Sequence, residues 1–241
     1  MSEKLWYLKN CPLFERLASE ELQSIEARSK ARLFPRGTPI YLPMDETNSV
    51  FLLASGRVKI CHLTPDGKQS ILAFIEPGEL FGELAMLDDG PRDEYAESVE
   101  KSTVVLIPGE VMRQTMESHA GVTLGVTKLI GLRRRRIEQR LKNLLFLSNR
   151  DRLTHLLLEL AEQYGVSDAS GLRLRIQLSH QELANVIGST RETVTVVLGE
   201  MQQEGLLSLG RRKIVISDLP RLASTVQRPA PKLSVESANR P

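Results

Sequence analysis

LSHQELANVIGSTRETVTVVLGEM, from Leu178 to Met201, is the stretch that decides the fold of this chain. Ser179 is followed three residues later by Glu182, and Ser189 is followed three residues later by Glu192. Each pair has the spacing of a capping box, in which a hydroxyl and a carboxylate satisfy the free amides at a helix start. The stretch therefore predicts two short helices in close succession, joined by a tight turn.

The second of these helices is predicted to have one apolar and one polar side. Gly188 precedes it, where a residue without a Cβ suits the turn. The apolar side repeats at i, i+3, i+4 and i+7 and comprises Val194, Val197, Leu198 and Met201. The opposite side comprises Arg191, Glu192, Thr195, Gly199 and Gln202. Such a helix fits the major groove of DNA, where Arg pairs with guanine and Glu accepts from cytosine. The alternative is an ordinary helical hairpin with Arg191 and Glu192 as a solvated pair.

A basic hairpin is predicted downstream, in the sequence LSLGRRKIVISD, with Arg211, Arg212 and Lys213 at or just after its turn. GSTRETVTVVLGEMQQEGLL followed by this hairpin resembles the C-terminal domain of the Crp/Fnr family of bacterial transcription regulators. The resemblance implies a winged helix-turn-helix that binds double-stranded DNA as a homodimer on a palindromic operator. RNA polymerase is the further partner expected if the protein is an activator.

The residues expected to contact DNA lie at the start of the second helix and in the wing. They are Ser189, Thr190, Arg191, Glu192, Thr193, Thr195, Val196, Arg211 and Lys213. Arg191 is expected to reach guanine and Glu192 cytosine, whereas Arg211 and Lys213 hold phosphates. The family often has another Arg at the position of Val196, where a methyl contact to thymine is expected instead.

Length and composition allow two modest domains, each able to bury a core. The chain has 241 residues and a net charge of +2, so attraction to DNA must come from local basic patches. Its two cysteines, Cys11 and Cys61, give neither a disulfide framework nor a metal-binding CxxC pair. No apolar run has the length of a membrane span, and the start lacks the apolar core of a signal peptide. We therefore expect a cytoplasmic protein with no membrane partner.

The N-terminal part is predicted to be short helices followed by a β domain. Residues 11–29 suggest one or two helices, and short apolar runs broken by Pro and Gly fill residues 32–108. This pattern is typical of a β sandwich or barrel and fits a jelly roll, and TPDGK, Thr64 to Lys68, has the composition of a hairpin turn. The predicted fold class is thus α+β, with a β jelly roll, a long dimerisation helix and a winged helix-turn-helix.

One motif in the β domain points to a ligand. FGELAMLDDGPR, Phe81 to Arg92, resembles the phosphate-binding cassette of cyclic-nucleotide-binding domains, which the Crp/Fnr family shares with cyclic-nucleotide-dependent kinases and channels. A Gly before a short helix offers free amides to an anion, an acid holds a ribose hydroxyl, and an Arg neutralises the phosphate. The effector pocket expected from this resemblance comprises Gly82, Glu83, Leu84, Ala85, Arg92, Asp93, Ile137 and Glu138.

Two departures from the family pattern argue against cyclic AMP as the effector. Asp93 and Glu94 follow Arg92 and put two carboxylates beside the phosphate site, where either carboxylate can pair with Arg92. The segment Asn143 to Leu147 resembles the hinge of the family, and this resemblance places Ile137 and Glu138 where cyclic-AMP-binding members have a Thr-Ser pair for adenine. We therefore expect no cofactor and no response to cyclic AMP, with a cyclic-AMP-dependent regulator as the alternative.

The segment from Gly109 to Leu147 lacks proline and is predicted to form the dimerisation helix and hinge. Residues at three- and four-residue steps resemble a coiled-coil seam. The seam comprises Val122, Val126, Leu129, Arg133, Ile137 and Leu144, with Arg140 at an equivalent step. A helix packed on its own domain is the alternative. The run Arg133 to Arg136 is expected to form a solvated collar paired with acids of the β domain, because successive residues spread around a helix.

Four regions follow from these patterns. Residues 1–108 form the helices and effector domain, 109–147 the dimerisation helix and hinge, 148–218 the DNA-binding domain, and 219–241 a tail. The tail has low hydrophobicity and repeated prolines, so we expect it to be disordered.

Other classes of protein find little support in the sequence. The histidines are isolated and no HExxH, GxSxG or Walker motif occurs, so no catalytic or metal-binding residue is predicted and an enzyme is not expected. A haem or redox sensor of the same family is an alternative, with Cys61 and His62 as the axial pair; two cysteines cannot supply the four thiolates of an iron–sulfur cluster. The third alternative is a cyclic-nucleotide-binding module that regulates a partner protein, which specific retention on DNA would separate.

Overall fold

The computed structural model describes residues 2–45, 48–86 and 91–231, and of Ala85 and Met86 only the backbone. The chain divides into two compact units between Arg136 and Ile137. One helix, α4 (Ala120–Phe146), runs through this division.

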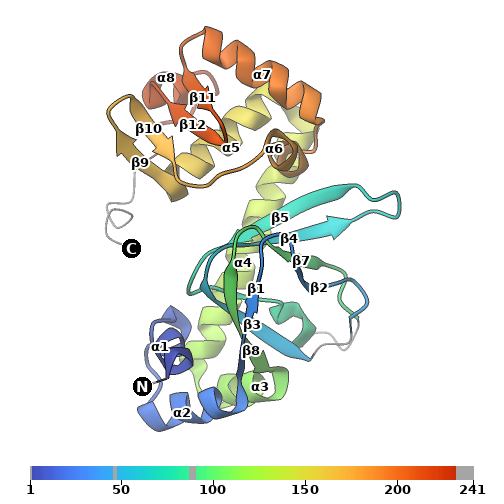
Figure 1. Cartoon of the computed structure of the whole chain (residues 1–241), viewed down its shortest axis with the longest axis vertical. Helices are drawn as coiled ribbons and strands as arrows, with labels where there is room; N and C mark the ends of the chain where they lie inside the picture. The colour runs from blue at the N-terminus through green and yellow to red at the C-terminus, as the bar shows by residue number, and fades with distance from the viewer. Residues whose placement is uncertain (1, 46–47, 87–90, 232–241) are drawn as a thin grey trace. The chain divides into compact units, whose positions relative to one another are not determined.

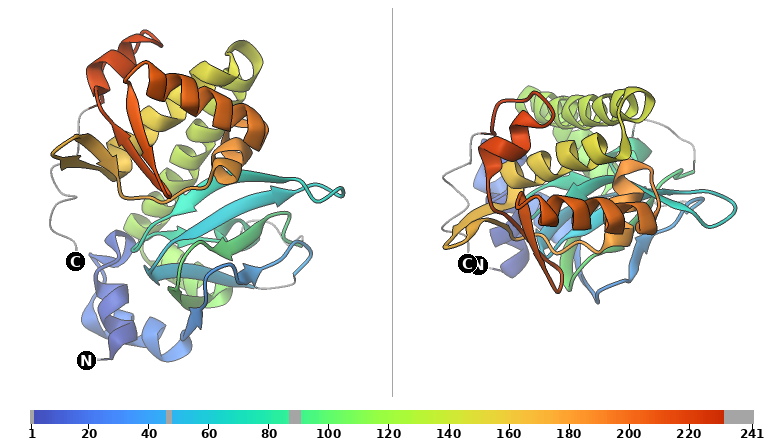
Figure 2. Two further views of the ribbon diagram at one scale, coloured as in Figure 1. Left: turned by 45° about the horizontal axis from the view of Figure 1, so that its top comes forward. Right: turned by 90° about the horizontal axis from the view of Figure 1, so that it is seen from above.

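The first unit is built on two four-stranded antiparallel sheets (Figures 1 and 2). The strands of one sheet are, in order, β1 (Lys30–Phe34), β8 (Ser102–Pro108), β3 (Ser49–Ser55) and β6 (Leu80–Phe81). Those of the other are β2 (Pro39–Tyr41), β7 (Tyr95–Ser98), β4 (Val58–Leu63) and β5 (Gln69–Ile75). The chain passes repeatedly from one sheet to the other, which confirms the predicted jelly roll.

Two apolar clusters hold this unit together. Between the sheets, Tyr41, Phe51 and Phe81 lie side by side, with ring centroids 5.2–6.3 Å apart. On the other face of the β3–β8 sheet, a second cluster is covered by helices, because alternate residues of β3 such as Val50 and Leu52 point there.

The covering helices come from both ends of the unit. They are α1 (Glu3–Lys9), the 3-10 turn η1 (Pro12–Phe14), α2 (Ser19–Arg28), α3 (Gly109–Ser118) and the start of α4. The helix α1 was not predicted, whereas η1 and α2 fall within the segment expected to be helical.

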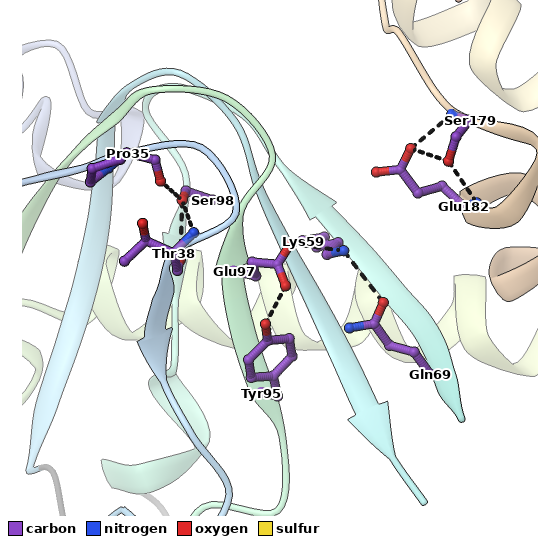
Figure 3. Close-up of polar contacts among 9 residues, drawn as sticks. All are labelled: Pro35, Thr38, Lys59, Gln69, Tyr95, Glu97, Ser98, Ser179 and Glu182. Atoms are coloured by element: carbon purple, nitrogen blue, oxygen red, sulfur yellow. Dashed lines mark hydrogen bonds and ion pairs between the residues drawn. The ribbon is translucent and has the colours of Figure 1, made fainter. Parts of the chain in front are cut away.

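Polar contacts stabilise the β2–β7–β4–β5 sheet and its turns. The hydroxyl of Ser98 donates to the Pro35 carbonyl and accepts from the Thr38 amide at 3.1 Å, and Lys59 pairs with Glu97 at 3.0 Å (Figure 3). The TPDGK segment forms the predicted turn of the β4–β5 hairpin. Its Gly67 has a positive φ of 80° and donates to the Thr64 carbonyl at 2.9 Å.

The segment predicted to be one dimerisation helix is two helices. α3 ends at Ser118, and His119 breaks the helix with an extended backbone before α4 begins at Ala120. The His119 ring contacts the Glu21 carboxylate of α2 at 2.6 Å. This contact fixes the break against the N-terminal helices.

The second unit combines helices with a small antiparallel sheet (Figure 1). Its elements after α4 are α5 (Asn149–Tyr164), β9 (Gly165–Asp168), β10 (Gly171–Leu174), α6 (His180–Ile187), α7 (Arg191–Gln203), β11 (Leu207–Gly210), β12 (Lys213–Ile216) and α8 (Leu219–Ser224). The sheet order is β11-β12-β10-β9. β11 and β12 form the predicted hairpin, and Arg212 in its turn has a φ of 55°.

The prediction that residues 219–241 are disordered is wrong for its first part. Asp218 caps α8 by accepting from the Arg221 amide at 2.9 Å, and Leu222 and Ala223 are buried. Two apolar side chains packed near α5 stabilise this helix despite the polar composition of the segment as a whole. Residues 232–241 of the predicted tail lie outside the described residues.

Candidate nucleic-acid interface and effector pocket

The helices α6 and α7 form the predicted helix-turn-helix. The Ser179 hydroxyl accepts from the Glu182 amide at 3.2 Å, and the Glu182 carboxylate accepts from the Ser179 amide at 2.7 Å, so the first predicted capping box is present (Figure 3). Gly188 ends α6 in the left-handed conformation, with φ of 64°. A side chain there would be strained, which is why glycine suits this turn.

The second predicted capping box is wrong by one residue. α7 begins at Arg191, and its cap is Thr190, whose hydroxyl accepts from the Thr193 amide at 3.2 Å. Ser189 instead continues the turn, with its amide donating to the Ala184 carbonyl at 3.0 Å. Ser and Thr are both favoured caps, so two adjacent hydroxyls leave the start of a helix ambiguous by one position.

The two sides of α7 are separated as predicted. Val194, Val197, Leu198 and Met201 are buried. Exposed on the other side are Thr190, Arg191, Glu192, Thr195 and Val196, whereas Ser189 and Thr193 are half-buried. Val196 is 60% exposed, which is high for an apolar side chain and leaves its methyl groups free for a contact.

The wing presents a basic turn, part of which is already paired. Arg211 and Lys213 are exposed, but the Lys213 amine lies 3.5 Å from the Asp168 carboxylate on β9. Arg173 on β10 lies at the same distance from Asp168. Asp168 therefore offsets part of the positive charge predicted for the wing.

Two arginines of α5 that were not predicted to have a role fix the helix-turn-helix. Arg152 donates to the Ile187 and Gly188 carbonyls at 2.9 and 3.3 Å, where α6 ends. Arg150 pairs with Glu204 at 2.6 Å, just after α7. Their signal in the sequence is weak, because an arginine on an amphipathic helix is usually solvated.

The cassette predicted in the first unit is formed by β6, Gly82 and the short turn η2 (Glu83–Met86). Gly82 has a φ of 69°, and a Cβ there would lie 2.8 Å from both Arg92 and Phe51. Glu83 is only 3% exposed, and both of its carboxylate oxygens accept from Nη1 of Arg133 on α4 at 2.9 Å. Arg133 also donates to the Leu80 carbonyl. The expected pairing of the arginine collar with acids of the β domain is thus confirmed for Arg133.

Arg92 is buried, with 5% exposure, and is held by the protein's own groups. It donates to the Ser49 carbonyl at 2.6 Å and to the Gly82 carbonyl at 3.2 Å. Its guanidinium carbon lies 4.3 Å from the centre of the Tyr41 ring, a cation–π distance. Burial lowers the pKa of Arg92 from its ordinary value.

The two acids after Arg92 differ in their surroundings. Asp93 is exposed, whereas Glu94 is half-buried and accepts from the Tyr41 hydroxyl at 2.5 Å. Burial raises the pKa of Glu94 from its ordinary value, and the negative charge of Glu83 also raises it. The cassette therefore contains two arginines and two buried or half-buried acids that interact with one another or with neighbouring groups.

The remaining predicted pocket residues are exposed or have side chains outside the described part of the chain. Leu84 is 49% exposed, and the Ala85 side chain and residues 87–90 of the motif lie outside the described residues. Ile137 and Glu138 are exposed and belong to the second unit, whereas the cassette belongs to the first.

The predicted dimer seam is wrong in its first half. Val122 and Val126 are 3% and 1% exposed and lie in the helix-covered cluster of their own unit, against which Leu129 also packs. The alternative interpretation, a helix packed on its own domain, holds for these turns. Arg133 is bonded to Glu83, whereas Ile137 and Leu144 are exposed.

The predicted alternative of a haem axial pair also meets an obstacle. Cys61 is buried in β4 and its neighbour His62 is exposed. Successive residues of a strand point to opposite faces of the sheet, so these two side chains diverge and cannot both bind one iron. Burial also raises the pKa of Cys11, the other thiol, to about 11.

Two further features of the described residues concern metal binding and the membrane. Among the described residues, no three His, Cys, Asp or Glu side chains gather closely enough to hold a metal ion. None of the described helices combines the length and hydropathy needed to cross a membrane.

Comparison with protein families matches both units. Residues 31–119 match the cyclic nucleotide-binding domain, and residues 151–225 match the Crp-like helix-turn-helix domain. A cyclic AMP receptor protein from Thermus thermophilus is 34% identical, over 84% of this chain and 91% of that protein. A global nitrogen regulator from Synechocystis is 29% identical, over 85% of this chain and 89% of that protein. The solved structure of a CooA mutant from Carboxydothermus hydrogenoformans has a TM-score of 0.77 and 25% identity, covering 91% of this chain and 98% of that one.

Proposed function

Because this chain belongs to the Crp/Fnr family of transcription regulators, we propose that it binds a palindromic operator as a homodimer, with α7 of each chain in a major groove. The observation that carries this proposal is the division of α7. Its apolar side is buried, and its first turns expose Arg191, Glu192 and Thr195. A helix held in this way presents hydrogen-bonding side chains to base edges without losing its packing.

Individual roles follow from side-chain chemistry. Arg191 donates to guanine and Glu192 accepts from cytosine, whereas exposed Val196 offers methyl groups to thymine. Arg211 in the wing and the amides near Thr190 hold phosphates. Lys213 contributes less than Arg211, because the Asp168 carboxylate lies 3.5 Å from its amine.

For the homodimer, the C-terminal half of α4 supplies the surface in place of Val122 and Val126. Ile137, Leu141 and Leu144 lie at i, i+4 and i+7, and they are 44%, 54% and 47% exposed. Three large apolar side chains on one face of a helix are stabilised by burial against a second copy. A dimer on a palindromic operator requires the two copies of α7 to lie about 34 Å apart, in successive major grooves.

The dimer is tested by placing a charge on this face. Leu141→Glu should give a monomer in sedimentation and weaken binding to a duplex selected by the wild-type protein from a random library. Gln139→Glu is the matched control, because it adds the same charge at an exposed position on the opposite side of the helix. A wild-type protein that sediments as a monomer while it binds this duplex would contradict the proposal.

For the effector, we infer that cyclic AMP is not the physiological ligand. Asp93 and Glu94 add two carboxylates directly after Arg92 in the sequence, and Arg92 already donates to two carbonyls. Ile137 and Glu138 lack the hydroxyls expected for adenine. The likeness to a cyclic AMP receptor protein favours the nucleotide, so direct measurement of binding decides between the two.

A further inference from the structure

A histidine outside the predicted DNA-contacting set is bonded to the outer face of α7. His180 is the first residue of α6, directly after the cap Ser179. Its ring Nδ1 lies 2.8 Å from Oγ1 of Thr195, an exposed residue of α7. The contact thus joins the start of the first helix to the face that we propose enters the groove.

The positions of the protons in this contact follow from the next hydrogen bond. The Thr195 hydroxyl donates to the Arg191 carbonyl at 2.8 Å, one turn earlier in α7. A hydroxyl has one proton, so Thr195 must accept from His180. Nδ1 therefore carries a proton in this arrangement. Nε2 is left with a lone pair in the neutral ring, or with a second proton in the charged ring.

The position of Nε2 in the fold indicates which part of the DNA it contacts. His180 is half-exposed, and within the described part of the chain its Nε2 has no hydrogen-bond partner. In a helix-turn-helix the first helix crosses the DNA backbone while the second lies in the groove. An atom at the start of the first helix, beside the outer face of the second, lies where phosphates pass.

We propose that His180 binds a backbone phosphate of the operator through Nε2–H of the charged imidazole. The neutral ring presents a lone pair at Nε2, which repels the phosphate oxygen. Uptake of one proton from solvent converts this lone pair into a donor, with no other bond formed or broken. DNA binding by each chain is therefore coupled to uptake of one proton at His180.

The charged side chains on the helices packed around His180 are hydrogen-bonded to other groups or lie in the first turn of α7. On α6, Glu182 accepts from the amide and hydroxyl of Ser179. On α5, Arg152 donates to carbonyls at the opposite end of α6. On α7, Arg191 and Glu192 lie in the first turn with opposite charges. The phosphate is thus the anion that favours the charged ring in the complex.

The sign of the pH dependence follows directly. At low pH the ring is already charged, so binding requires no proton. As the pH rises, binding must include uptake of the proton that gives the ring its charge, and the affinity falls. The logarithm of the dissociation constant should then rise by up to about one per pH unit for each His180 in contact.

The test measures DNA binding by the full chain at constant ionic strength from about pH 5 to about pH 8. The probes are a duplex selected by the wild-type protein and a scrambled duplex of the same composition. His180→Gln should remove this slope on both probes, because a phosphate contact carries no sequence information. His180→Arg should bind tightly with the slope also absent, since a guanidinium stays charged.

His155→Gln is the matched control, because His155 lies in the same unit on α5 and contacts Arg228 rather than α7. It should leave the slope unchanged. A His180→Gln slope equal to that of the wild type would overturn the inference, as would a wild-type affinity that rises with pH. The inference rests on the proposed DNA contact of α6 and α7. A wild-type chain retained on no duplex would overturn both, whereas retention with no His180 effect overturns the inference alone.

Discussion

The cassette of the first unit and the outer face of α7 both combine arginine with glutamate, but they differ in what those side chains bind. In the cassette, Glu83 and Arg92 are nearly fully buried and bonded to Arg133 and to backbone carbonyls. On α7, Arg191 and Glu192 are exposed, and in the described part of the chain their side chains have no hydrogen bond or ion pair. A buried charge needs a partner within the protein, whereas an exposed charge remains available to a ligand.

The largest effect should come from breaking the internal pairing of the cassette. Arg133→Ala leaves the buried Glu83 carboxylate without its partner, which should lower the free energy of unfolding by about 3–5 kcal/mol. Urea denaturation measures this loss. Arg135→Ala, at an exposed position of the same helix, should change stability by no more than about 0.5 kcal/mol. Equal stability of the two variants would show that Glu83 does not depend on Arg133.

The second test asks whether the cassette can be made to bind a nucleotide. If each mismatched polar contact costs about 1–3 kcal/mol, the loss of two or three contacts weakens a micromolar site to about millimolar or beyond. Calorimetry with cyclic AMP should then detect no binding to the wild-type protein. Replacing Asp93→Ser and Glu94→Ala together should raise the affinity, because two negative charges near Arg92 are removed. Micromolar binding by the wild type, coupled to tighter DNA binding, would identify the protein as a cyclic-AMP-dependent regulator.

The third test concerns the exposed region of the comparison. Arg191→Ala should cost about 1–3 kcal/mol on the selected duplex and relax the sequence preference at one base pair. Arg211→Ala should instead weaken binding to all sequences alike and reduce the salt dependence by about one unit. Competition binding with selected and scrambled duplexes distinguishes these outcomes. An equal loss on both duplexes for Arg191→Ala would assign Arg191 to the DNA backbone.

The smallest effect should be the pH dependence of stability that Glu94 causes. Burial raises the pKa of this carboxyl, so the folded state holds the proton more tightly than the unfolded state. The contribution of Glu94 to the free energy of unfolding is therefore present at pH values below the ordinary pKa of a carboxyl group. It is lost as the pH rises through the raised pKa. Glu94→Gln keeps an acceptor for Tyr41 but has no charge. Its melting temperature should exceed that of the wild type at neutral pH, and the two should converge in acid.

The sequence predicted the second unit better than the first because its signals are local. The capping box at Ser179 and the apolar repeat of α7 depend on residues within a few turns, and both appear in the structure. Where local signals are equivalent, prediction fails by one position, as with Ser189 and Thr190.

The first unit shows which properties local patterns do not determine. Val122 and Val126 have the periodicity of a dimer seam, but they are buried by helices from the N-terminal end of the chain. The same periodicity occurs in helices that pack against a partner chain and in helices that pack against their own core. Only the tertiary structure distinguishes the two. The role of Arg133 in holding Glu83, fifty residues away in the sequence, was anticipated only as a general pairing of the collar with acids.

The participation of α4 in the core of the first unit has a consequence during synthesis on the ribosome. Leu5 and Leu8 of α1 share an apolar cluster with Val122 and Val126, which are translated more than a hundred residues later. A nascent chain that ends at Pro108 has completed its sheets but lacks α3 and α4, which cover part of one face of the β3–β8 sheet. The N-terminal helices therefore acquire their final packing only when the start of α4 has left the ribosome, and a truncated chain ending before α4 exposes an apolar surface prone to aggregation.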